Sequence, residues 1–147
     1  MATAPTTVPA LLHELSSPLT VLISTGDLLR NKVPDTIEPF IRRLGDTSHR
    51  FGREVVELRA SLEEKIDLQS SAKAAAQIRQ LAADWRGYQA ELSDLVLAIQ
   101  AAQVRLEDSL LDRILNQNLP NGLSGLTRNI DRLEAIRPED LALPEQG

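Results

Sequence analysis

The chain has 147 residues, a length that leaves room for one domain of ordinary size and argues against a multidomain enzyme. Only 3% of the residues are aromatic while 42% are hydrophobic, so we expect a helical core of Leu, Ile, Val and Ala. Cysteine is absent, which excludes disulfides, thiolate metal sites and cysteine nucleophiles. The formal charge is −5 and basic residues are dispersed among acidic ones, which argues against nucleic acid as a partner.

The sequence predicts no targeting or membrane segment. The longest uncharged apolar stretches, residues 15–26 and 95–104, are shorter than the roughly 18 to 20 residues that a bilayer crossing needs, so we expect no membrane insertion. Residues 1–9 lack the basic residues of a signal peptide. Together with the absence of cysteine, these features predict a cytoplasmic protein.

Proline and glycine positions divide the chain into four predicted parts. The run 40–119 contains no proline, so it could be nearly all helix. We predict a flexible N-terminal tail over 1–9, a helical hairpin over 10–69, a C-terminal region with one long and one short helix over 70–136, and a flexible tail over 137–147.

The hairpin is predicted from apolar residues at heptad spacing. Its first helix covers about 10–31. After a turn, Asp35 or Thr36 is expected to cap the second helix, which has Pro39 in its first turn. Ser48 is the only interruption of the apolar seam of this second helix.

A long third helix carries Trp85 and Tyr88 in its seam, where we expect them to be core or dimer-interface anchors. Its apolar pattern shifts near 106–109, which indicates a kink or break. The segment 120–122, Pro-Asn-Gly, is predicted to end the helix, and a short fourth helix then covers 123–133.

The predicted fold class is all-α, because no sustained period-two alternation indicates a strand. Short connections between long helices favour an antiparallel hairpin that is extended to a four-helix bundle or coiled-coil-like domain. The first helix is too short to cover both the second and the third, so a seam shared with a second subunit is expected. The sequence therefore favours a homodimer.

His13 is the residue whose setting points to chemistry. In a helix it shares an exposed polar stripe with Ser16, Ser17, Thr20, Ser24 and Asp27. Its imidazole could act as a nucleophile that Glu14 orients or deprotonates, although an ordinary surface histidine fits the same pattern. Pro18 should free the Glu14 carbonyl from its helical hydrogen bond.

The string from His13 to Thr20, H-E-L-S-S-P-L-T, resembles the phosphoacceptor box of bacterial sensor histidine kinases. The family's dimerisation and phosphotransfer hairpin is also similar in its spacing to residues 11–68. The resemblance implies that His13 is the residue that is phosphorylated and that Glu14 is its general base.

The remaining box positions match the family in part. Ser17 occupies the Thr, Asn or Ser position one turn below the histidine, and Pro18 matches the kinking proline. Ser16 departs from the basic residue that is common there, and Ser17 is not the Thr or Asn associated with dephosphorylation of the partner. Phosphatase activity is therefore not implied.

A complete kinase of this family continues into an ATP-binding domain with Asn-rich and Gly-rich boxes, which this sequence lacks. Residues 116–122 suggest them only superficially, and a helix end with Pro and Gly stop signals explains this segment better. The resemblance implies a histidine phosphotransferase or kinase-like phosphoacceptor rather than an autonomous ATP-dependent kinase. We expect the chain to have no cofactor of its own and expect Mg²⁺ on the receiver partner. Whether the chain is an enzyme stays open.

Three functions are open at this point. The first is a phosphorelay with a response-regulator receiver domain or a histidine kinase in trans. The family's docking mode implies contacts at Thr20, Val21, Ser24, Asp27, Leu28, Glu38, Ile41 and Arg42. The alternatives are a non-catalytic helical module that regulates or scaffolds such a partner, and a structural coiled-coil subunit. His49, beside arginines, is expected at the surface, and the two histidines make no metal-ligand pattern.

Overall fold

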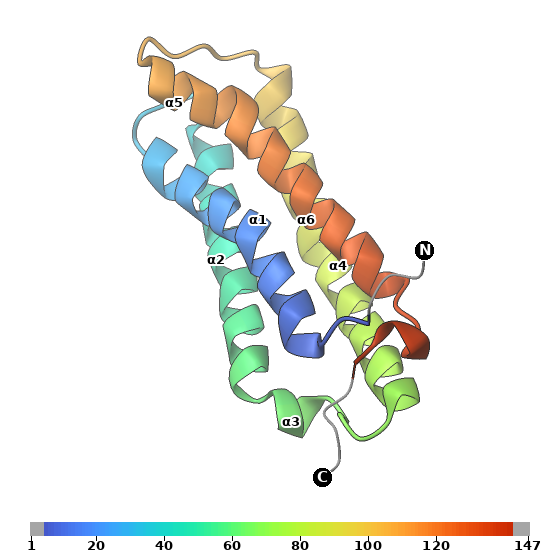
Figure 1. The fold of residues 1–147 in the computed structure, drawn as a ribbon. Helices are drawn as coiled ribbons and strands as arrows, with labels where there is room; N and C mark the ends of the chain where they lie inside the picture. The colour runs from blue at the N-terminus through green and yellow to red at the C-terminus, as the bar shows by residue number, and fades with distance from the viewer. Residues whose placement is uncertain (1–4, 143–147) are drawn as a thin grey trace.

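Helices form every regular element in the computed structural model, which describes residues 5–142 (Figure 1). Short loops join the long helices, so the chain runs up and down along one axis. The α-helices are α1 (Val8–Leu29), α2 (Glu38–Ala60), α3 (Leu62–Lys65), α4 (Ser71–Ala101), α5 (Ser109–Arg113) and α6 (Leu119–Glu134); the π-helical turn η1 (Ile114–Asn118) joins α5 to α6, and the 3₁₀ turn η2 (Pro138–Asp140) follows. The predicted all-α class is confirmed.

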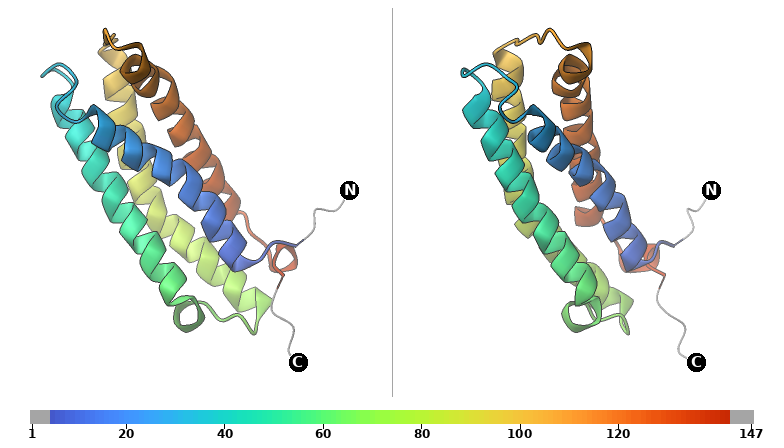
Figure 2. Two further views of the ribbon diagram at one scale, coloured as in Figure 1. Left: turned by 60° about the vertical axis from the view of Figure 1, so that its left-hand side comes forward. Right: turned by 90° about the vertical axis from the view of Figure 1, so that its left-hand side faces the viewer.

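The four long helices form a closed ring of neighbours. α1 packs on α2 and α6, and α4 packs on the other sides of the same two helices (Figure 2). The apolar seams therefore meet inside one chain, as in an antiparallel four-helix bundle. The first helix was predicted to be too short to cover its neighbours, so that a second subunit was expected to cover the hairpin. In the structure α4 and α6 of the same chain cover it.

The core is built mainly from the aliphatic residues that the composition predicts, with one aromatic cluster. Phe51 of α2 stacks on Tyr88 with ring centroids 5.0 Å apart and lies 5.4 Å from the ring of Trp85. Trp85 and Tyr88 are therefore core anchors between α2 and α4. Ser48, the predicted interruption of the seam, is fully buried, and its hydroxyl has no hydrogen-bond partner in the part of the chain that the structure describes.

The first and last residues that the structure describes lie side by side next to the N-terminus of α1. Thr7 caps this helix by accepting a hydrogen bond from the Ala10 N–H at 3.2 Å. Thr6 pairs with the other end of the chain, donating to the Asp140 carbonyl at 2.9 Å and accepting from the Ala142 N–H at 3.0 Å. The parts of both predicted tails that the structure describes, 5–9 and 137–142, are thus bonded to the body. Residues 1–4 and 143–147 lie outside the described residues.

The hairpin turn differs from the prediction at the start of α2. Ile37 precedes this helix and makes no side-chain cap, so neither Asp35 nor Thr36 is the capping residue. Pro39 does lie in the first turn, as expected. The turn is closed instead by Glu38, whose carboxylate accepts a hydrogen bond from the backbone N–H of Asn31 at 3.1 Å. Asn31 has a φ of 64°, a conformation that Asn tolerates better than most residues.

The prediction of a helix stop at residues 120–122 is wrong. The helical path continues from α5 through the wide turn η1 into α6, and Pro120 lies in the first turn of α6. Leu119 donates its N–H to the Ile114 carbonyl, five residues back, which widens the helix just before the proline. The break predicted near 106–109 is present, because α4 ends at Ala101 and α5 begins at Ser109, with the loop 102–108 between them.

The helices also bear on the membrane prediction. Within the described range 5–142, none combines the length and the apolar character that a bilayer crossing requires.

Candidate functional site

His13 lies on the exposed face of α1, near the N-terminal end of this helix. Its side chain is exposed, and no hydrogen bond or ion pair within residues 5–142 engages its ring. The predicted polar stripe is present, since Ser17, Thr20 and Ser24 are exposed and Ser16 is half-buried. A ring with no internal partner is open to a reagent or a protein partner.

Glu14 does not contact His13 and is held by α6 instead. Its carboxylate forms an ion pair with the guanidinium of Arg132. The same guanidinium also donates to the Thr6 hydroxyl at 3.3 Å. The ion pair is partly solvated, with side-chain exposures of 45% for Arg132 and 43% for Glu14. The predicted contact between the acidic residue and the histidine is therefore absent from the described residues.

Pro18 has the local effect that the sequence predicts, with a partner that it does not predict. Proline removes the N–H that would bond to the Glu14 carbonyl four residues back. The amide of Asn129 in α6 donates to this carbonyl at 3.1 Å in place of the missing group. Gly125 makes room for the close approach, because a Cβ there would lie only 3.1 Å from the Cβ of Pro18.

A polar groove runs between α1 and α6 beside the box; we call it the α1–α6 groove. It has a volume of about 630 Å³. Most of its walls are polar, with amide, hydroxyl, carboxylate and guanidinium groups. It is lined by Glu14, Ser17, Pro18, Val21, Asn118, Asn121, Gly122, Gly125, Arg128 and Asn129. The residues of α6 in this groove escaped prediction, since nothing in the sequence indicates which face of the fourth helix meets α1.

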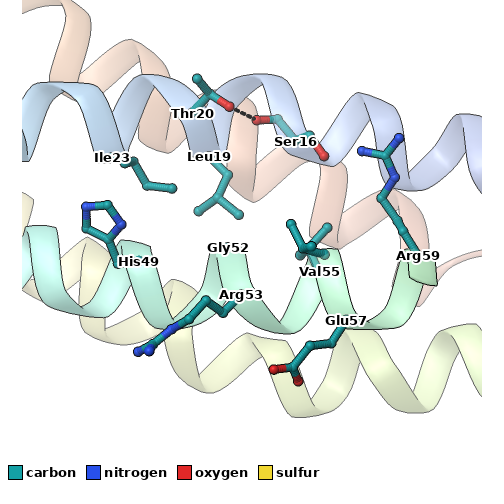
Figure 3. A pocket seen from close by; sticks show the side chains of 11 residues that line it. Ser16, Leu19, Thr20, Ile23, His49, Gly52, Arg53, Val55, Glu57 and Arg59 are labelled. Atoms are coloured by element: carbon teal, nitrogen blue, oxygen red, sulfur yellow. Dashed lines mark hydrogen bonds between the residues drawn. The ribbon is translucent and has the colours of Figure 1, made fainter. Parts of the chain in front are cut away.

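A second groove lies on the other side of the outer face of α1, between α1 and α2 (Figure 3). This α1–α2 groove has a volume of about 530 Å³. Leu19 and Ile23 point from α1 toward α2, and basic side chains stand at the two ends. It is lined by Ser16, Leu19, Thr20, Ile23, His49, Gly52, Arg53, Val55, Val56, Glu57 and Arg59, so His13 lies outside it.

The predicted docking residues do not all share one surface. On α1, Thr20, Val21, Ser24, Asp27 and Leu28 are exposed. Among them, Thr20 lines the α1–α2 groove, whereas Val21 lines the α1–α6 groove. The two grooves therefore divide the predicted surface between opposite sides of α1.

The docking residues predicted on α2 need one correction. Ile41 is fully buried, because it lies on the core face of the helix, so it cannot belong to a docking surface. Arg42 is exposed but donates to Glu38 at 3.0 Å. Burial of the Glu38 carboxyl opposes its ionisation, but hydrogen bonds from Arg42 and the Asn31 N–H outweigh this and lower its pKa. Glu38 thus fastens the hairpin turn.

The other residues that the sequence singled out have structural roles. His49 is at the surface, as predicted, and its Nε2 lies 3.1 Å from the Asp27 carboxylate, which links α2 to α1. Asn116 donates to the carbonyl of Val104 at 3.2 Å and so fastens the loop before α5. Among the described residues, no cluster of three or more His, Asp or Glu side chains could hold a metal ion.

No family model, curated protein or solved structure gives a significant match to the chain. A functional assignment has to come from the chemistry of the site.

Proposed function

We propose that the protein is a histidine phosphotransfer protein of two-component signalling, in which His13 accepts and donates a phosphoryl group. The observation that carries the proposal is the exposed His13 ring on the outer face of α1, which has no hydrogen-bond or ion-pair partner among residues 5–142. The proposal also rests on the resemblance of the string from His13 to Thr20 to a phosphoacceptor box, whose proline is accommodated here by Asn129.

The chemistry is an in-line transfer. The lone pair of the neutral His13 ring attacks the phosphorus of an aspartyl phosphate on a receiver domain, or of a phosphohistidine on a kinase supplied in trans. A nitrogen–phosphorus bond forms while the bond from phosphorus to the donor atom breaks, and the donor leaves with the electron pair. Mg²⁺ on the receiver would neutralise the phosphoryl charge, so this chain needs no nucleotide or metal site of its own.

The α1–α2 groove is the docking surface that we propose for the receiver. It offers apolar side chains, including Val56 with 64% of its surface exposed, and it is also lined by Ser16 and Thr20 of the polar stripe that carries His13. Its lining includes Arg53 and Arg59, which suit an acidic partner. This surface replaces the part of the predicted docking set that the burial of Ile41 removes.

A non-catalytic interaction module is the second candidate, and one observation favours it. The α1–α2 groove does not include His13, and Glu14 is bound to Arg132 rather than to the histidine. A partner could therefore dock in the groove and be inhibited or scaffolded without any transfer. Such a module would keep its binding when His13 is replaced.

The proposed location of the protein is the cytoplasm. The two candidate oligomeric states are a homodimer and a single chain. The homodimer was expected because the hairpin seam needed cover, and α4 and α6 supply that cover within one chain. A measurement of mass in solution by sedimentation equilibrium decides between 16.2 kDa and twice this value.

The test is a transfer assay. The purified protein and the His13→Ala variant are incubated with a panel of phosphorylated receiver domains, and acid-labile, base-stable phosphate is counted. Label on the wild type but not on His13→Ala supports the phosphotransfer function. Receiver binding without label on either protein overturns it and leaves the interaction module.

A further inference from the structure

Two residues of α6 hold Glu14, one at its main chain and the other at its side chain. Asn129 fixes the main chain, because its amide bonds to the Glu14 carbonyl at 3.1 Å. Arg132, one turn away on the same helix, holds only the carboxylate. If Arg132 lets go, the backbone of α1 stays in place and the Glu14 side chain alone has to rotate.

The ion pair between Arg132 and Glu14 competes with any contact between Glu14 and His13. While the carboxylate is paired with the guanidinium it is drawn toward α6, and the His13 ring has no hydrogen-bond acceptor among residues 5–142. Because both partners of the ion pair are close to half-exposed, the ion pair is weak enough to open without unfolding. Opening of this ion pair would release the Glu14 carboxylate from α6.

We propose that Arg132 is a positioning residue that holds Glu14 in reserve, so that Glu14 can accept a hydrogen bond from the His13 ring only when this ion pair opens. The inference rests on the proposed function for its consequence in transfer, but its structural part concerns two side chains only. In the released state, Glu14 accepts the N–H of one ring nitrogen, which leaves the lone pair of the other nitrogen pointing outward to attack phosphorus.

The charged groups around this segment of α1 define the controls. Arg128 lines the same α1–α6 groove one turn from Arg132, and no ion pair with it is found within residues 5–142. Asp140 of η2 lies near Arg132, and α2 contributes Glu57 and Arg59 across the α1–α2 groove. Arg128→Gln therefore removes the same charge as Arg132→Gln from the same helix without releasing Glu14.

The experiment measures the ring of His13 directly. Nitrogen-15 NMR at pH 8 reports which ring nitrogen carries the proton in the wild type, Arg132→Gln, Arg128→Gln, Glu14→Ala and the double variant Glu14→Ala/Arg132→Gln. We expect Arg132→Gln alone to shift the tautomer ratio toward the form that donates to Glu14. We expect no shift when Arg132→Gln is introduced into Glu14→Ala, because the alanine side chain has no acceptor.

The second measurement is the rate of His13 phosphorylation by phosphoramidate, in which the bond from phosphorus to the ammonia nitrogen breaks as the bond to the ring forms. The label is counted in a His49→Ala background. We expect Arg132→Gln to raise the rate about two- to fivefold, the ratio that a partly exposed ion pair of ordinary strength controls, and Arg128→Gln to leave it unchanged.

The outcomes separate the two proposals. A tautomer shift in Arg132→Gln that needs Glu14 supports the positioning role, even if no variant takes up phosphate and the proposed function fails. Equal tautomer ratios in Arg132→Gln and Arg128→Gln overturn the positioning role, as does a lower labelling rate in Arg132→Gln than in the wild type.

Discussion

The amide nitrogen of Asn129 lies 3.1 Å from the carbonyl oxygen of Glu14, and this hydrogen bond connects the last long helix to the first. It supplies the donor that the helix lacks because residue 18 is proline. An interhelical bond thus replaces an intrahelical one at the box. The kink position of α1 is therefore fastened to α6 and does not stand alone.

The first prediction is that the value of Asn129 depends on Pro18. We expect Asn129→Ala to lower the free energy of unfolding by about 1 kcal/mol, the usual contribution of one hydrogen bond. In a Pro18→Ala background the cost should fall, since the alanine returns an N–H to the Glu14 carbonyl. Urea denaturation of the four proteins in the cycle measures this coupling.

Asn121→Ala is the control for this cycle, because Asn121 lines the same groove but is exposed. It should change stability by less than about 0.5 kcal/mol, as surface substitutions do. If Asn129→Ala costs the same in the wild type as in the Pro18→Ala background, the bond does not compensate for the proline.

The second prediction concerns the crossing of α1 and α2. A Cβ on Gly26 would lie 2.9 Å from the Cα of Gly45, where the obstacle is backbone and cannot rotate away. We expect Gly26→Ala to destabilise the protein by about 1–3 kcal/mol through overpacking. Gly87 has nothing within 4 Å of the same position in α4, so Gly87→Ala should stabilise by about 0.5–1 kcal/mol. Thermal and urea unfolding compare the two, and stabilisation by both changes would contradict the close crossing.

Heptad spacing predicted much of this fold, because long helices with one apolar face leave few alternatives. The existence of the four helices, the antiparallel hairpin and the core position of Trp85 all follow from local pattern. Pro120 misled the prediction because a proline can begin a helical turn as well as stop one, and the π-turn before it is invisible in the sequence.

The candidate site was half predictable. His13, Glu14 and Pro18 lie on one helix, so their relation follows from spacing alone. Asn129 and Arg132 lie more than a hundred residues away in sequence, and which face of α6 meets α1 depends on packing. The docking position predicted at Ile41 is wrong because Ile41 belongs to the apolar seam of α2 and is buried in the core.

The third prediction is a titration of Tyr88, the only tyrosine in the chain. Burial against Phe51, and next the negative charge of Glu54, raise the pKa of its phenol above the ordinary value of 10. The neutral phenol is favoured in the folded state, so its contribution to stability is complete below the unfolded pKa and is lost as pH rises through the folded one. Absorbance of tyrosinate should rise at higher pH in the native protein than in urea. Coincident curves would mean that the phenol is solvated in the native state.

The fourth prediction tests the α1–α2 groove as a docking surface. Val56 lines the groove and is 64% exposed, so Val56→Asp should leave the core intact while placing a charge on the proposed contact. We expect the affinity for a cognate receiver to fall about tenfold, equivalent to about 1.4 kcal/mol. Labelling of His13 by phosphoramidate, which needs no docking, should be unchanged.

Leu97→Asp is the matched control, because Leu97 is 59% exposed on α4 and lines neither groove. Titration calorimetry with the three proteins measures the affinities, and an equal loss from Leu97→Asp would remove the α1–α2 groove as the docking site.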